Sequence, residues 1–142
     1  LLSRRQRQMC IRDRTSSYVN TRSISKDGGI STFRSSVVVS AKAKGSKSAV
    51  SCQSLMLDDI SRSDTIPAMD IRTKDADVGH EAKIGRISDD AVFYLMSRGI
   101  SEEDARALIV SGFADNVSKE LPLEYAVEMN NLIHLEMKGS IG

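Results

Sequence analysis

Few side chains in this chain of 142 residues are of the types that bind metals or act as nucleophiles. There are two cysteines, Cys10 and Cys52, and two histidines, His80 and His134. His80 is followed directly by Glu81, but no second His or Cys lies at metal-ligand spacing from it. Alternation along a strand would also direct the two side chains to opposite faces. From the residues alone, burial as a small strand residue explains Cys52 better than metal binding does.

Other constellations that could carry chemistry are weaker. Asp58, Asp59 and Asp64 suggest a divalent-ion loop, but the glycine and the spacing of an EF-hand are missing, so we predict a solvated turn. The sequence has no phosphate-binding GxxxxGK(S/T) loop and no signature of a catalytic serine or cysteine. We therefore predict that the chain is not an enzyme, and that His134 is a surface residue.

Composition indicates a globular domain, with 40% hydrophobic and 27% charged residues. The longest apolar runs, at 37–39 and 108–110, are far too short to span a bilayer, and no apolar signal segment follows the basic start. Two cysteines cannot build a disulfide framework, which favours a reducing compartment. We therefore expect a cytoplasmic protein without membrane contact.

The charges are distributed unevenly along the chain. Residues 1–50 carry eleven Lys and Arg against two Asp, whereas residues 51–142 carry nine against seventeen Asp and Glu. Such a basic arm could bind nucleic acid through phosphate contacts. However, residues 1–14 (LLSRRQRQMCIRDR) have no clear periodicity and are similar to a translated sequencing adapter. We predict that this segment is not native, so that nucleic-acid binding is not favoured and Cys10 takes no part in chemistry.

Residues 16–87 form short β-prone runs separated by polar or glycine turns. The expected strands are at 31–40, 49–57, 65–71 and 76–84. Three consecutive valines in the first of them suit a strand buried on both faces, and Pro67 predicts an edge strand or a bend. The spacing is compatible with the coils of a parallel β-solenoid, although a small β-sandwich would give a similar pattern.

After residue 87 the hydrophobic period becomes helical. Ser88 and Ser101 are predicted N-caps with acidic first turns, and Gly99 and Gly112 are predicted to end the first two helices. A third helix is expected over residues 122–138, because proline is tolerated at a first helical position. All three are too short to be stable alone and need a neighbour. Apolar residues of the third helix follow a three-four spacing: Tyr125, Met129, Leu132, Ile133 and Met137.

Seven blocks of the sequence occur in the order SISKDGGIST, SCQSLMLDD, SRSDTIPAMDI, VGHEAKIGRI, FYLMSRGISEEDARALIVSGF, ELPLEYAVEMN and EMKGSIG. Together they resemble the SufB/SufD family of iron–sulfur cluster assembly proteins, and its SufB branch in particular. The resemblance covers residues 23–142, and the longer family members imply that the chain is a C-terminal fragment. It implies a mixed fold, with a truncated right-handed parallel β-helix over 15–86 and a C-terminal α-helical subdomain over 87–142.

The resemblance also implies a function. A chain of this family is expected to be an assembly scaffold that holds a transient iron–sulfur cluster and binds a SufC-type ABC ATPase through its helical subdomain. ATP hydrolysis would then come from that partner. Further implied partners are SufD or a second SufB, and a cysteine desulfurase system as sulfur donor. The alternative is a SufD-like structural subunit that binds the ATPase without a cluster-ligand role.

The candidate ligands come from the same resemblance. Cys52 matches the family cysteine implicated in cluster assembly, and His80 and Glu81 match the family's functional His-Glu pair. The resemblance therefore implies a cluster site of Cys52, His80 and Glu81, with the thiolate as the usual iron–sulfur ligand. Many family members carry an acid before the histidine, where this chain has Gly79, so one possible ligand is absent here.

Overall fold

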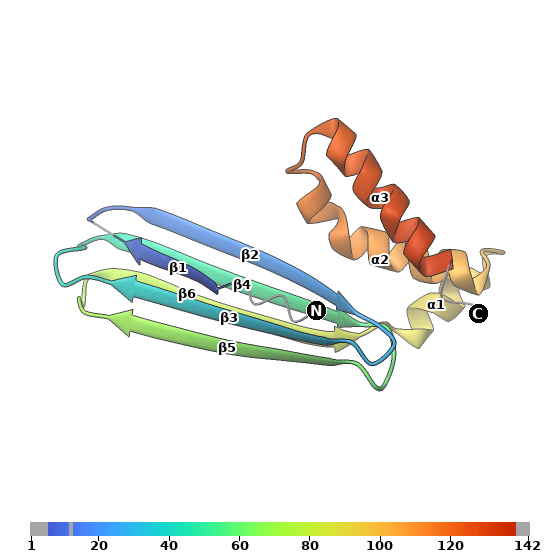
Figure 1. Ribbon diagram of the computed structural model, residues 1–142, viewed down its shortest axis with the longest axis horizontal. Helices are drawn as coiled ribbons and strands as arrows, with labels where there is room; N and C mark the ends of the chain where they lie inside the picture. The colour runs from blue at the N-terminus through green and yellow to red at the C-terminus, as the bar shows by residue number, and fades with distance from the viewer. Residues whose placement is uncertain (1–5, 12, 139–142) are drawn as a thin grey trace. The chain divides into compact units, whose positions relative to one another are not determined.

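The computed structural model describes residues 6–11 and 13–138 (Figure 1). These residues divide into two compact units, one ending at Gly85 and the other beginning at Arg86. The first unit consists of strands and the second of helices. The fold is therefore mixed, with parallel β-sheets followed by three helices, as we expected from the sequence at this level of detail.

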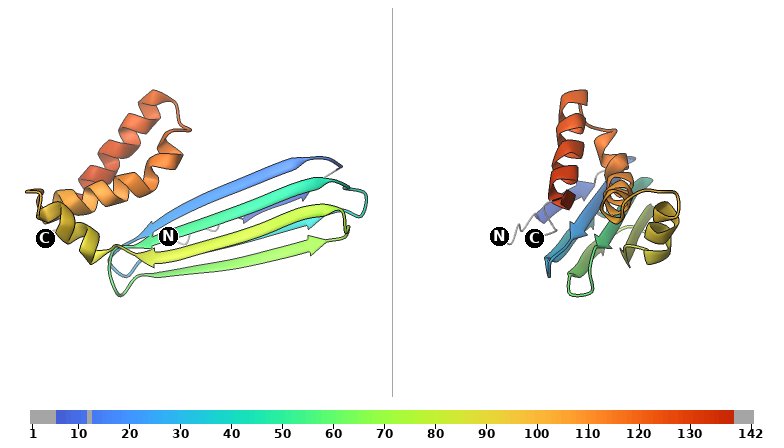
Figure 2. Two further views of the ribbon diagram at one scale, coloured as in Figure 1. Left: turned by 180° about the vertical axis from the view of Figure 1, so that it is seen from behind. Right: turned by 90° about the vertical axis from the view of Figure 1, so that its right-hand side faces the viewer.

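The strands alternate between two sheets. Six strands are described, namely β1 (Gln6–Ile11), β2 (Ser16–Ser25), β3 (Ile30–Val39), β4 (Ser46–Met56), β5 (Arg62–Ile71) and β6 (Ala76–Arg86). One sheet has the order β1-β3-β5 and the other the order β2-β4-β6 (Figures 1 and 2). β1 pairs with β3, β3 with β5 and β2 with β4, all in parallel. The four strands expected between residues 31 and 84 correspond to β3 through β6.

An apolar core lies between the sheets, because strands of both sheets contribute to it. Val37 and Val39 of β3 are almost completely buried, as is Val50 of β4. On β4, every second residue from Ser46 to Ser54 is buried, as expected for a strand with one face directed inward. The core cluster comprises Val37, Val39, Ala43 and Val50, against which Val19, Phe33, Ala76 and Val78 pack.

Further along β4, hydroxyl groups replace aliphatic side chains in the interior. Ser54 Oγ lies 2.7 Å from Ser23 Oγ of β2, its neighbour in the same sheet and 31 residues earlier in the chain. Ser63 of β5 donates a hydrogen bond of 2.7 Å to the same Ser54 oxygen from the other sheet. Because a buried hydroxyl is costly without a partner, such mutual hydrogen bonds allow this part of the interior to be polar.

The turn between β4 and β5 is organised by Asp58. Its carboxylate accepts hydrogen bonds from the backbone N–H groups of Asp27, Ile60 and Ser61. Hydrogen bonding from Ser61 lowers the pKa of Asp58 against the opposing effect of desolvation. The predicted turn is thus confirmed for Asp58, whereas Asp64 lies on β5.

Two further expectations for the β region can be compared with the strands. Pro67 lies on β5, which is an edge strand of its sheet, so the edge-strand prediction is confirmed. Of the three consecutive valines, Val37 and Val39 are buried and Val38 is half-buried, so this strand is covered on both faces to different degrees.

The two helix starts predicted from the sequence are confirmed. α1 (Asp89–Met96) follows Ser88, whose Oγ accepts a hydrogen bond from the Ala91 N–H. α2 (Glu102–Ser118) follows Ser101, whose Oγ accepts from the Asp104 N–H. In each case the cap satisfies a backbone donor that has no partner within the helix.

The two helix ends differ from each other. Gly99 has φ +87° and donates its N–H to the Met96 carbonyl, so it closes α1 as predicted. Gly112 does not end α2, and that prediction is wrong, because the helix continues to Ser118. Packing of one helix face outweighs the cost of an internal glycine, which is about 1 kcal/mol. Ala107, Val110, Ala114 and Ser118 are buried on that face, and Ala105 is buried on the opposite side of the helix.

α3 (Leu123–Lys138) packs against α2. Met137 is buried and Met129 and Ile133 are half-buried, so these residues form the packed stripe of the helix. Tyr125 and Leu132, which share the predicted apolar spacing, are instead exposed. Within the described ranges, no helix is long and apolar enough to cross a membrane.

Candidate functional site

Cys52 lies on the inward-facing row of β4 and is only 2% exposed. It is a free cysteine, and its Sγ lies 3.4 Å from Thr65 Oγ1. Thr65 belongs to β5, a strand of the other sheet, so this contact crosses the interior between the sheets. On the same row of β4, Val50 of the apolar core precedes Cys52 and Ser54 follows it. The sulfur is therefore shielded from solvent at the border between the apolar and the hydroxyl-lined interior.

His80 lies on β6, the neighbour of β4 in the same sheet. Ala76 and Val78 of β6 pack against the core, so alternation also directs His80 inward. The imidazole is half-buried, and its buried Nε2 has no hydrogen-bond partner among the residues that the structure describes. A buried nitrogen without a partner is costly, and a neutral imidazole nitrogen is a common metal ligand. Nε2 of His80 is thus available to a ligand.

Glu81 is placed differently from the other two candidates. Its side chain is exposed and forms an ion pair of 3.0 Å with Lys83. The alternation that we predicted for residues 80 and 81 is therefore present, with His80 on the inner row and Glu81 on the outer one. In the described part of the chain, no three or more His, Cys, Asp and Glu side chains form a group that could hold a metal ion. The structure thus brings Cys52 and His80 to the inner side of neighbouring strands and does not bring Glu81 there.

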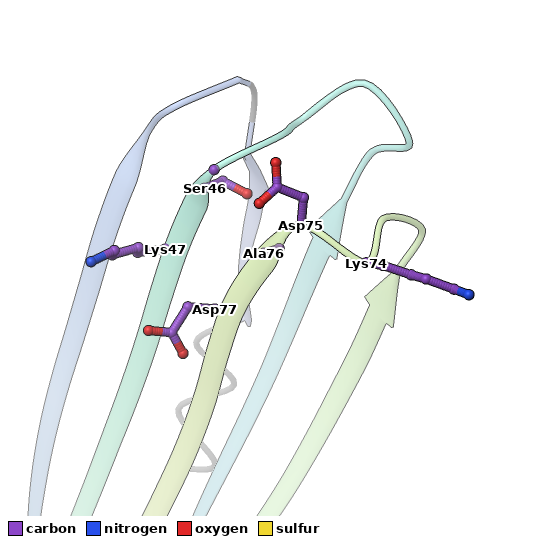
Figure 3. Close-up of a pocket in the computed structure, with 7 residues that line it drawn as sticks. Ser46, Lys47, Lys74, Asp75, Ala76 and Asp77 are labelled. Carbon is purple, nitrogen blue, oxygen red and sulfur yellow. The ribbon is translucent and has the colours of Figure 1, made fainter.

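A cavity of about 290 Å³ lies elsewhere in the β unit, where β4 and β6 begin (Figure 3). Figure 3 shows that Lys47 and Lys74 at its rim extend in opposite directions, with Asp75 and Asp77 between them. Neither Cys52 nor His80 lines this cavity. It therefore offers no place for thiolate or imidazole chemistry.

Thr65 is a residue of the site that sequence reasoning missed. Thr65 and Cys52 are equally spaced about the turn that joins β4 and β5, and so are Ser63 and Ser54. Polar side chains at mirrored positions around a turn are the signal from which the cross-interior pairs could have been found. The identity of Thr65 as the partner of Cys52 required knowledge that β4 and β5 lie in facing sheets.

The helical unit exposes an apolar surface. Tyr125, Leu132 and Leu135 lie on one side of α3, because a helix advances by about 100° per residue, and we call these three residues the outer stripe. Tyr125 and Leu135 are 68% and 66% exposed, and Leu132 is 51% exposed. The outer stripe lies apart from the stripe that packs against α2. Exposed apolar residues that gather on one surface are typical of protein interaction sites.

Comparison with known proteins shows which family the chain resembles. The family model of the SufBD core domain, described as SUF system FeS cluster assembly, matches residues 4–113. This match includes part of the segment 1–14, whose foreign origin stays a prediction. The matched range includes Cys52, His80 and Glu81.

Curated relatives agree with this match. A SufBD family iron–sulfur cluster assembly protein of Mycobacterium leprae is 48% identical over 128 residues, which is 90% of this chain and 15% of the relative. A SufBD family protein of Staphylococcus saprophyticus and the iron–sulfur cluster assembly protein SufB of Bacillus subtilis are each 52% identical over 128 residues, or 90% of this chain and 28% of the relative. The chain thus spans less than a third of the length of these relatives. Because the family model covers most of its residues, this chain belongs to the SufBD family of the SUF system, whose members take part in iron–sulfur cluster assembly.

Proposed function

We propose that this chain is part of a scaffold on which iron–sulfur clusters are assembled, and that Cys52 and His80 bind the nascent cluster. One observation carries the proposal. In a chain of an iron–sulfur assembly family, a free buried thiol and an imidazole nitrogen that has no partner among the described residues lie on the inner rows of two neighbouring strands. The cluster is the cargo of such a scaffold.

The chemistry of the two side chains suits iron. Thiolate sulfur is the usual protein ligand of iron–sulfur clusters, and imidazole replaces it in some of them. Cys52 would bind through Sγ, and His80 would bind through the lone pair of Nε2. Glu81 enters the proposal only as an auxiliary ligand, because its carboxylate would have to exchange Lys83 for iron on the outer face.

Two principal ligands from one chain leave iron positions open. Donors from outside this chain would fill them, and we propose that SufD or a second SufB provides these donors. A cluster held by few ligands of mixed type is released more easily than one held by four thiolates, which suits a scaffold that passes its cargo on. Sulfur would arrive from a cysteine desulfurase system.

We propose further that the two sheets are coils of a right-handed parallel β-helix. Three observations support this architecture: consecutive strands alternate between sheets, pairing is parallel, and Ser23 and Ser54 lie side by side one circuit of 31 residues apart. Right-handed crossovers are strongly preferred between parallel strands of one sheet. A solenoid of this kind would hold Cys52 and His80 on stacked coils.

The helical unit would bind a SufC-type ABC ATPase. The exposed outer stripe of α3 supports a docking role, since such residues are costly in water unless a partner covers them. The sequence has no phosphate loop, so ATP hydrolysis would occur in the partner.

The cluster site is tested by anaerobic loading of the chain with ferrous and ferric iron and sulfide. Cys52→Ala should lose most of the bound iron and sulfide, because a methyl group replaces the thiolate ligand. His80→Ala should bind a cluster that is lost faster to a chelator. Cys10→Ala and His134→Ala are the matched controls, and they should behave as the unchanged chain does. Bound iron and acid-labile sulfide are measured for each variant. Far-ultraviolet circular dichroism shows whether each variant is folded.

One result would overturn the assignment. If folded Cys52→Ala retained as much iron and sulfide as the unchanged chain, Cys52 would not be a ligand. Binding of the ATPase together with a dispensable Cys52 would then favour a SufD-like structural subunit.

A further inference from the structure

Cys52 has a hydroxyl partner that the family assignment does not supply. Its Sγ lies 3.4 Å from Thr65 Oγ1, within hydrogen-bonding range for sulfur, and the two residues come from facing sheets. Ser54 and Ser63, two positions further toward the turn, are joined in the same manner at 2.7 Å. The contact therefore belongs to a row of polar pairs that cross the interior.

Because the neighbouring serines pair with one another, the Thr65 hydroxyl is the polar partner of Cys52. Ser54 is engaged by both Ser23 and Ser63, so these three hydroxyls satisfy one another. On the other side of Cys52 in the same row of β4 lies Val50 of the apolar core, which offers no polar side-chain group. In the part of the chain that the structure describes, Thr65 is the residue whose side chain is within hydrogen-bonding distance of the buried sulfur.

A threonine hydroxyl can serve a sulfur in two states because its hydrogen rotates freely. It accepts a hydrogen bond from a protonated thiol, and it donates one to a thiolate that binds iron. Hydrogen bonds to ligand sulfur affect the properties of iron–sulfur sites, and outer partners fix the orientation of metal ligands. Thr65 is also β-branched, so its own rotamer on the strand is restricted.

We propose that Thr65 is a positioning residue for the cluster site, which orients Cys52 Sγ and donates a hydrogen bond to it while iron is bound. This inference rests on the proposed role of Cys52 as a ligand. Thr65 contributes through its hydroxyl group rather than through its volume. Valine keeps the volume without the hydroxyl, whereas serine keeps the hydroxyl with a smaller volume, so the two substitutions separate these contributions.

The first test needs no cluster. The infrared S–H stretching band is recorded in a Cys10→Ala background, where Cys52 is the remaining thiol. Thr65→Val should shift this band to higher frequency, because the S–H group loses its acceptor, and Thr65→Ser should restore the original position. Thr32→Val, an exposed threonine on β3, is the matched control and should leave the band unchanged. An unshifted band in Thr65→Val would overturn the hydrogen bond.

The second test uses the chain loaded with ferrous and ferric iron and sulfide. Thr65→Val should shift the visible sulfur-to-iron charge-transfer bands and lose its cluster to a chelator about tenfold faster, in line with other outer partners of metal ligands. Thr65→Ser should match the unchanged chain. Equal loss rates in all three proteins, or a serine variant as defective as the valine variant, would overturn the positioning role. Retention of the cluster by Cys52→Ala would instead overturn the proposed function, and the infrared result would still decide the hydrogen bond.

Discussion

Individual residues in the β unit divide the interior into two chemical regions. Valines of β3 and β4 fill one part, and hydroxyls of Ser23, Ser54 and Ser63 fill the other. Cys52 lies at the border, where a sulfur can be buried and still find a polar neighbour. The sequence predicted that Cys52 is buried, but the pattern of a single strand does not reveal which residue of another sheet lies opposite.

Asp58 provides a prediction about pH. Its pKa is lowered in the folded chain, first by hydrogen bonding from Ser61. A carboxyl group with a lowered folded pKa stabilises the fold above its ordinary pKa, and the contribution is lost as the pH falls through the lowered value. Asp58→Asn should therefore melt at a lower temperature than the unchanged chain at pH 7, with the difference shrinking below about pH 3.8.

Thermal melts at a series of pH values measure this effect. The asparagine amide keeps one oxygen acceptor, but its NH₂ group replaces the oxygen that accepts from the Asp27 N–H. Asp77→Asn, an exposed aspartate on β6, serves as the matched control and should melt like the unchanged chain at each pH. A difference between Asp58→Asn and the unchanged chain that stays constant down to pH 2 would contradict the prediction.

Helices and strands could be predicted to different extents. Ser88 and Ser101 identify the helix starts, because a cap acts within one turn and needs no tertiary contact. Glycine identifies a helix end only where the chain adopts a positive φ. Gly99 does so at +87°, whereas Gly112 lies within a helix whose buried alanines continue past it. The length of α2 was thus decided by packing that the local pattern does not contain.

The two glycines give opposite predictions for the same substitution. Gly112→Ala should stabilise the chain by about 0.5–1 kcal/mol, because an added Cβ would meet no other part of the described chain within 4 Å beyond its own helix turn, and alanine favours the helix. Gly99→Ala should destabilise it by about 1 kcal/mol, because an L-residue is strained at φ +87° although space is available.

Chemical denaturation followed by circular dichroism near 222 nm, the usual helix signal, measures both variants. Each serves as the control for the other, since the chemical change is identical. Similar stability changes of the same sign in the two variants would show that backbone conformation is not the cause.

At the scale of the whole molecule, the two units carry different parts of the proposed function. The β unit carries the proposed cluster ligands, and the helical unit carries the exposed outer stripe. Tyr125 and Leu132 share one apolar spacing with Met129 and Ile133 in the sequence, because exposed and buried stripes of one helix can share apolar composition. Only the packing of α3 on α2 separates Met129 and Ile133 from them.

The outer stripe gives a prediction about the partner. Replacement of Tyr125, Leu132 and Leu135 by serine should weaken binding of a SufC-type ATPase at least about tenfold, because central apolar anchors dominate interface energies. Binding is measured by titration calorimetry with the full chain. Leu123→Ser with Val127→Ser, on another exposed side of α3, is the matched control and should bind normally. Unchanged affinity of the folded triple variant would exclude the outer stripe as the docking surface.

The sequence by itself determined the strands β3 to β6 and the three helices, where the two N-caps lie, and to which family the blocks point, whereas β1 and β2 were not among the expected strands. These properties depend on neighbours within a few residues or on the order of whole motifs. It also determined that His80 and Glu81 face opposite sides, because strand alternation is a local rule. The tertiary structure decided that Thr65 contacts Cys52, that His80 Nε2 is buried without a partner in the described chain, and that α2 continues through Gly112. Each of these depends on contacts between segments far apart in sequence, and only their packing together fixes such contacts.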